Sequence, residues 1–131
     1  MRVVLDTNVI VAAFATRGLC ADVLEVCISG HTLVVSAYIL DEVREALLKK
    51  IKTPKGIVHE VIDYLRTTAE VVTPAEIESS VCRDMTDLPI VGTAAKGGAS
   101  CIVTGDADLL ALKSHRGIDI MTPREFWESL R

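Results

Sequence analysis

The sequence has no long hydrophobic run. Its longest uninterrupted apolar stretch, Val9 to Ala15, is far shorter than the ~18 residues that a membrane-spanning helix needs. It also lacks the charged start, apolar segment and cleavage site of a signal peptide, because Met1-Arg2 leads directly into a candidate strand. We therefore expect no membrane association, and a cytoplasmic location follows by default.

Positive charge is not in excess. The chain has 14 Lys and Arg against 18 Asp and Glu, and its net charge is −4. This balance argues against a protein that holds nucleic acid by bulk electrostatics, although the objection weakens if several acids share one metal site. A local basic cluster (Lys49, Lys50, Lys52 and Lys55) has two interpretations, and a solvated helix end that complements the helix dipole is favoured over a binding patch.

Cysteine and histidine patterns typical of zinc sites or catalytic triads are absent. The four cysteines have no CxxC spacing and no histidine cluster nearby, so they are predicted to be buried free thiols. The three histidines fall at a strand start, within a helix and at a helix end, with no Ser or Cys placed beside them by pattern. These residues are Cys20, Cys27, Cys82 and Cys101, and His31, His59 and His115.

Short β-branched runs alternate with longer helical ones. With 131 residues, this pattern predicts one α/β domain over residues 1–131, a three-layer α/β/α sandwich with a five-stranded parallel sheet. The expected strands are Val3–Leu5, Thr32–Val35, Glu70–Val72, Cys101–Thr104 and Ile118–Met121. The expected helices are Val9–Ala15, Ala21–Ser29, Ala37–Ile51, Ile57–Thr68, Leu88–Lys96 and Ala107–Lys113, and a capping box at Thr122 to Glu125 begins a last one.

Two acidic residues lie at the carboxyl ends of strands that we expect to be neighbours in the sheet. Asp6 ends the first strand and Asp106 follows the fourth, so a strand order of 3-2-1-4-5 would place them face to face at the carboxyl edge of the sheet. Glu42, on the helix after the second strand, and Asp87, at the start of another helix, could reach the same crevice. Each has a second interpretation: Asp87 as a helix N-cap, and Glu42 as part of a solvated helix face.

Several carboxylates in one crevice indicate a cation. Two carboxylates about 4 Å apart repel by ~4 kcal/mol at an effective dielectric constant of 20, so three or four cannot all stay ionised alone. A site of oxygen ligands without His or Cys suits Mg²⁺ or Mn²⁺. Such ions in an acidic cleft favour phosphoryl chemistry, in which the metal activates water and offsets charge on the transition state.

Four elements, in order along the chain, resemble the PIN-domain ribonucleases, in particular the VapC-like toxins of toxin–antitoxin pairs. They are Leu5-Asp6-Thr7-Asn8 after the first strand, Ser36 followed six residues later by Glu42, Asp87 seven residues before Ala94, and Thr104-Gly105-Asp106-Ala107-Asp108. The resemblance covers essentially the whole chain.

The resemblance implies cleavage of single-stranded RNA that depends on Mg²⁺ or Mn²⁺. Its acidic quartet falls on Asp6, Glu42, Asp87 and Asp106, a less regular fifth acid falls on Asp108, and polar supports fall on Asn8 and Thr104. We expect Asp6, Asp87 and Asp106 to bind the ion, and Glu42 to help bind it or to position the attacking water. Members of the family commonly form homodimers and are silenced by a small antitoxin that inserts into the cleft.

Three other functions can be compared with a ribonuclease on the same residues. A phosphohydrolase of the haloacid dehalogenase type needs a second acid two residues after its nucleophile, and here that residue is Asn8. A receiver domain is excluded in a similar way, because this chain has no paired acids after the first strand and no phosphate acceptor after the third. A catalytically silent PIN-like interaction module stays open, although an incomplete acidic set would favour it and this set is complete.

Overall fold

The fold is built on one sheet of six strands. The computed structural model describes residues 1–131, and its strand order is β3-β2-β1-β4-β6-β5. All neighbouring pairs are parallel except β5 with β6. The strands are β1 (Arg2–Leu5), β2 (Thr32–Ser36), β3 (Glu70–Val72), β4 (Cys101–Val103), β5 (Ser114–His115) and β6 (Ile118–Met121).

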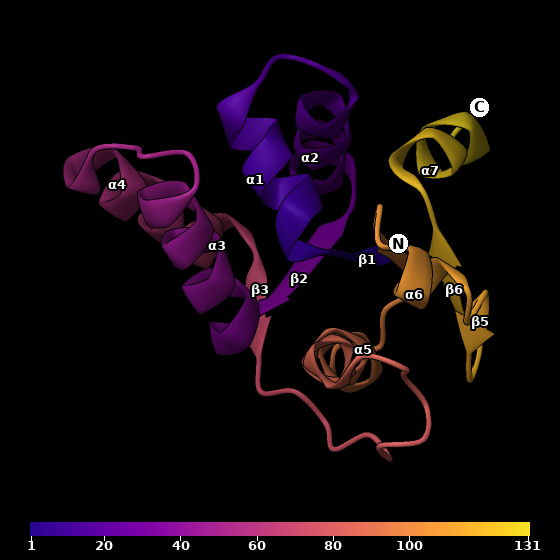
Figure 1. The fold of residues 1–131 in the computed structure, drawn as a ribbon. Coiled ribbons are helices and arrows are strands. Elements are labelled where there is room, and N and C mark those ends of the chain that lie inside the picture. Colours follow the sequence, from indigo (N-terminus) through magenta and orange to yellow (C-terminus); the bar gives the residue numbers. More distant parts are fainter.

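Helices cover both faces of this sheet. In Figure 1, α1 (Thr7–Ala15), α2 (Leu19–Gly30) and α7 (Pro123–Ser129) lie on one face and α5 (Leu88–Lys96) on the other. The pair α3 (Ala37–Lys49) and α4 (Lys55–Thr68) stands beside the β3 end, and α6 (Ala107–Leu110) follows β4. None of these helices combines the length and apolarity needed to cross a membrane. The predicted α/β/α sandwich is therefore confirmed.

The predicted strands and their order are confirmed, with one addition at the sheet edge. The fifth predicted strand, Ile118–Met121, is β6, and β5 has no counterpart among the predicted strands. The predicted helix Ala107–Lys113 is wrong beyond Leu110, because Lys113 has a φ of 62°, which a right-handed helix cannot continue. The chain then turns back as a hairpin through Arg116 and Gly117, both with positive φ. His115 therefore lies in a strand and not at a helix end.

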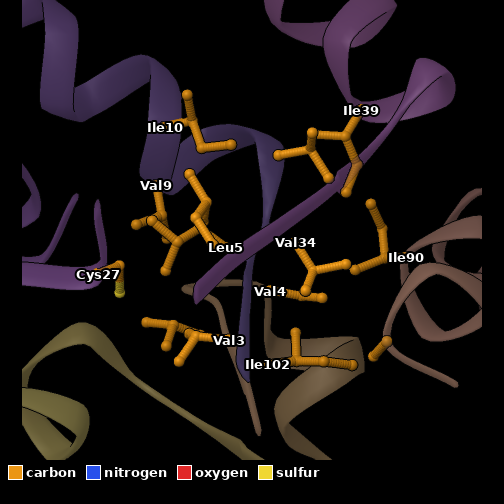
Figure 2. Close-up of a cluster of buried hydrophobic side chains, with 14 of the residues drawn as sticks. Val3, Val4, Leu5, Val9, Ile10, Cys27, Val34, Ile39, Ile90 and Ile102 are labelled. Atoms are coloured by element: carbon orange, nitrogen blue, oxygen red, sulfur yellow. The ribbon is translucent and has the colours of Figure 1, made fainter. Parts of the chain in front are cut away.

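The central strands are buried on both sides, which explains their continuous apolar runs. Val3, Val4 and Leu5 of β1 are fully buried. Figure 2 shows Val3 and Leu5 on the side of Cys27, and Val4 on the side of Ile90 from α5. Because alternate side chains of a strand point to opposite faces, β1 packs against helices on both. The carboxyl end of β1, which Asp6 directly follows, is therefore fixed by packing on both faces.

Gly92 lets the loop after β3 lie directly on α5. A Cβ atom at this position would come 2.3 Å from the carbonyl oxygen of Ala75, whose N–H donates a 3.0 Å hydrogen bond to the Gly92 carbonyl. We expect Gly92→Ala to destabilise the protein by about 1–3 kcal/mol, because the backbone contact must open. The urea midpoint measures this change.

The matched control is Gly56→Ala in α4, where a new Cβ meets no atom within 4 Å. Alanine has a higher helix propensity than glycine, so this variant should be unchanged or more stable by up to ~1 kcal/mol. Equal midpoints for the two variants would show that the α5 contact does not require glycine.

Two smaller predictions can be checked directly. Cys27, Cys82 and Cys101 are buried free thiols as predicted, whereas Cys20 is free but only half-buried. The predicted capping box at Thr122 and Glu125 is confirmed.

Candidate active site

The four predicted acids line one cleft at the carboxyl edge of the sheet. Asp6 directly follows β1 and Asp106 follows β4, and these strands are neighbours with Leu5 paired to Val103. Glu42 comes from α3, and Asp87 from the junction of a 3₁₀ turn, η1 (Met85–Asp87), with α5. The cleft has a volume of about 650 Å³ and is lined by all four. The strand order predicted from sequence thus brings Asp6 and Asp106 to the same cleft.

Asp6 is the most firmly held of these acids. It is the N-cap of α1: its Oδ1 accepts a 2.8 Å hydrogen bond from the Thr7 N–H, and its Oδ2 accepts a 2.7 Å bond from the Thr104 hydroxyl. The residue is only 7% exposed. Burial raises the pKa of Asp6 above its usual value, and the two hydrogen bonds oppose this change only in part.

Thr104 connects Asp6 to Asp106, the acid that follows β4. While its hydroxyl donates to Asp6, it accepts a 3.0 Å hydrogen bond from the Asp106 N–H. The Asp106 carboxylate in turn accepts from the Asp108 N–H at 3.1 Å, which caps α6. The Asp108 side chain does not line the cleft, so the structure does not bring this fifth acid to the other four.

Asp87 has a buried oxygen with no partner. It occupies the N-cap position of α5, as one of its two interpretations expected, but its side chain makes no capping hydrogen bond. The residue is 7% exposed, and its Oδ2 has no hydrogen-bond partner. Burial, as the larger cause, and the neighbouring Asp106 carboxylate, as the second, raise the pKa of Asp87 to about 7. Such a carboxylate is costly to keep ionised without a cation.

Glu42 is held by two hydroxyl groups. Thr7 Oγ1 lies 2.9 Å from its Oε1, and the Tyr38 hydroxyl lies 3.2 Å from its Oε2. The same Tyr38 oxygen is 3.2 Å from the carbonyl oxygen of Thr86 in η1. Glu42 is half-buried, which contradicts the interpretation of a fully solvated helix face. Its carboxylate has one orientation toward the cleft.

Four residues that build this site were given no role from the sequence, although two of them, Thr7 and Ser36, stand in its motifs. Thr7 lies inside the first motif, and Tyr38 precedes Glu42 by four residues, which is the spacing that puts two side chains on one helix face. Ser36 caps α3, and its Oγ lies 2.8 Å from the buried Thr93 hydroxyl of α5. This contact joins the helix of Glu42 to the helix that follows Asp87, and no spacing rule predicts it.

Asn8 and Asp84 lie at the rim. Asn8 is exposed, lines the cleft and makes no side-chain hydrogen bond. Asp84, which the sequence analysis did not select, also lines the cleft and accepts hydrogen bonds from the N–H and hydroxyl of Thr86. Those bonds lower the pKa of Asp84, so it remains ionised beside the buried acids.

The donor set fits a hard divalent cation. Asp6, Asp87 and Asp106 offer only carboxylate oxygens, and the unpartnered Oδ2 of Asp87 supplies a free ligand atom. As the side chains stand, no three Asp, Glu, His or Cys residues are grouped tightly enough to hold a metal ion. Asp87 and Asp106 nevertheless lie close enough for the Asp106 carboxylate to raise the pKa of Asp87, and a bound cation would offset that repulsion.

Comparison with known proteins agrees with this fold. No curated protein matches the sequence. Similar solved structures include VapBC2 from Rickettsia felis bound to a DNA fragment from their promoter, and FitAcB from Neisseria gonorrhoeae. The first has a TM-score of 0.64 at 18% identity and covers 92% of this chain and 97% of its own. The second has a TM-score of 0.57 at 18% identity and covers 93% of this chain and 98% of its own. A sequence model of the PIN domain matches residues 2–108, so the chain belongs to the PIN domain family.

Proposed function

We propose that the protein is a metal-dependent endoribonuclease that cleaves single-stranded RNA. The observation that carries this proposal is the buried, unpartnered Oδ2 of Asp87, in a cleft also lined by Asp6 and Asp106. A structural acid would have both carboxylate oxygens paired or solvated, whereas the Oδ2 of Asp87 is buried and unpaired. Membership of the PIN domain family supports the nuclease assignment.

The roles of the residues follow from their positions. Asp6, Asp87 and Asp106 would hold Mg²⁺ or Mn²⁺, with Asp108 as an outer fifth acid, and Thr104 and Asn8 would support the site. The bound ion supplies a more acidic water and a counter-charge for the phosphoryl group. Thr104 fixes Asp6 in one rotamer and aligns the Asp106 backbone with it, so two ligands are oriented before binding.

Glu42 would orient the attacking water or help to hold the ion. Its carboxylate is fixed by the hydroxyls of Thr7 and Tyr38. Burial and the negative charge of Glu42 raise the pKa of Tyr38 to about 12, so its hydroxyl stays protonated and acts as a donor at neutral pH. The three side chains thus form a positioning unit at the wall of the cleft.

The sequence resemblance to VapC-like toxins extends the proposal to partners. The similar structures are of VapBC2 and FitAcB, and their names and the resemblance support a small antitoxin protein as partner of this chain. A homodimer and a cytoplasmic location belong to the same proposal. A catalytically silent interaction module is the outcome that remains if no cleavage is found.

The experiment that tests the proposal combines cleavage with a thermal melt. Purified protein is incubated with a fluorescent single-stranded RNA in Mg²⁺, in Mn²⁺ and in EDTA, and the melting temperature is measured in the same buffers. We expect products and a higher melting temperature only with a divalent ion. Intact RNA together with an unchanged melting temperature would contradict the nuclease assignment.

Tyr38→Phe tests the positioning unit. Removing the hydroxyl frees one side of Glu42 and leaves the Thr86 carbonyl without this donor. We expect kcat to fall by about three- to tenfold with KM unchanged, because a looser carboxylate positions water less well. Tyr64→Phe, on the exposed surface of α4, is the matched control and should behave as the wild type. Equal kcat values for both variants would remove Tyr38 from this role.

A further inference from the structure

The candidate cleft does not end at the acids. It continues along α3 to Lys49 and Lys50, which line the same cleft as Asp6 and Asp87. Its lining contains seven carboxylates and these two lysines. A surface so acidic repels a phosphate backbone everywhere except near cations. The position of its cations therefore decides where an RNA strand can lie.

Only one of those cations is without a carboxylate partner. Lys49 pairs with Glu45 at 2.6 Å, and Asp41, also in the lining, pairs with Arg44 at 2.8 Å. Lys50 forms no ion pair and is exposed. It caps α3 through its backbone N–H, which donates to the Ala46 carbonyl, so the ammonium group is not needed for that contact.

The spacing of Lys50 and Glu42 suits an extended strand. Lys50 follows Glu42 by eight residues, which separates their Cα atoms by about 12 Å along a helix axis. An extended single strand of a few nucleotides can span this separation. The two ends of the cleft then serve different phosphates of the same chain.

We propose that Lys50 binds a backbone phosphate of single-stranded RNA that flanks the bond to be cleaved. This inference rests on the proposed function, and it assigns the path of the RNA strand along α3. The competing explanation, that the lysines only complement the dipole at the end of α3, predicts an effect on stability but none on RNA. The two explanations therefore differ in what a substitution changes.

The test is Lys50→Ala against Lys55→Ala as a matched control. Lys55 is an exposed lysine at the start of α4 that does not line the cleft, so both variants lose one positive charge. Cleavage of a ten-nucleotide single-stranded RNA in Mn²⁺ is followed at 25 to 200 mM KCl. We expect Lys50→Ala to raise KM about fivefold at low salt with kcat unchanged. The slope of log KM against log salt should fall by ~0.7, the value for one phosphate contact on a single strand.

The outcomes separate this inference from the proposed function. If the wild type cleaves RNA and the two variants share one KM and one salt slope, the phosphate site is overturned and the nuclease stands. A lower melting temperature of Lys50→Ala with an unchanged slope also overturns it, in favour of the dipole explanation. If the wild type cleaves nothing, fluorescence anisotropy with the same RNA decides: weaker binding by Lys50→Ala than by Lys55→Ala supports the site, and equal binding overturns it.

Discussion

Asp6→Asn is expected to reduce metal-dependent RNA cleavage by at least ~10²–10³-fold without unfolding the protein. The loss follows because Asn removes one negative charge from the three acids proposed to hold the ion. The fold should persist because Asn is also a good N-cap, and its side-chain oxygen can accept the Thr7 or the Thr104 bond. The measurements are the initial rate of cleavage and the melting temperature with and without Mn²⁺.

The second signature of Asp6→Asn is in the melting temperature. The wild type should gain stability from the ion, and the variant should not. In EDTA the variant should be at least as stable as the wild type at neutral pH, because burial disfavours the ionised Asp6. Asp22→Asn, an exposed acid in the first turn of α2, is the matched control. Wild-type cleavage by Asp6→Asn would sink the assignment of the site.

Stability without metal is expected to fall as the pH rises toward 8. The pKa of Asp87 is about 7 in the folded protein and 3.8 in the unfolded chain, so the folded state binds the extra proton. The resulting stability is complete below about pH 4 and is lost as the pH rises through 7. In the open cleft, solvent screening limits this contribution to about 1–2 kcal/mol, or ~5 °C in melting temperature.

Asp87→Asn is the control for this pH dependence, because Asn does not titrate. In EDTA, the difference in melting temperature between pH 5 and pH 8 should be smaller in this variant than in the wild type. Divalent ions should act in the opposite direction, since they need the ionised carboxylate: below pH 7, apparent ion affinity should drop about tenfold for each pH unit. The same pH profile in the variant and the wild type would show that Asp87 is not the titrating group.

The sequence determined the sheet and the place of two acids in it. Parallel strands that are covered on both faces need continuous apolar runs. The burial of β1, β2 and β4 could therefore be predicted from the apolar runs in the sequence. Right-handed crossovers then leave few strand orders, and the predicted one matches. Asp6 and Asp106 follow from this order, because the residue after a strand must lie at that edge.

The tertiary structure decided what short-range patterns could not. Whether Asp87 caps α5 or faces the cleft depends on how the loop after β3 packs on Gly92, a contact between distant segments. Whether Glu42 is solvated depends on hydroxyls that reach it from α1 and from its own helix. The short hairpin of β5 and β6 has too few residues to show an alternating pattern.

The lysines of α3 show the same division. The sequence places Lys49 and Lys50 at a helix end, where the dipole explains them, and no local pattern distinguishes that role from binding. Packing of α3 against α1 lays the helix along the cleft, so one face carries both an acid and an unpaired ammonium. The local sequence thus determined which charged side chains are present and on which helix or strand they lie. The long-range contacts between helices and strands determined which of these side chains line the same cleft. Only those contacts set the distances between side chains on which electrostatics and chemistry depend.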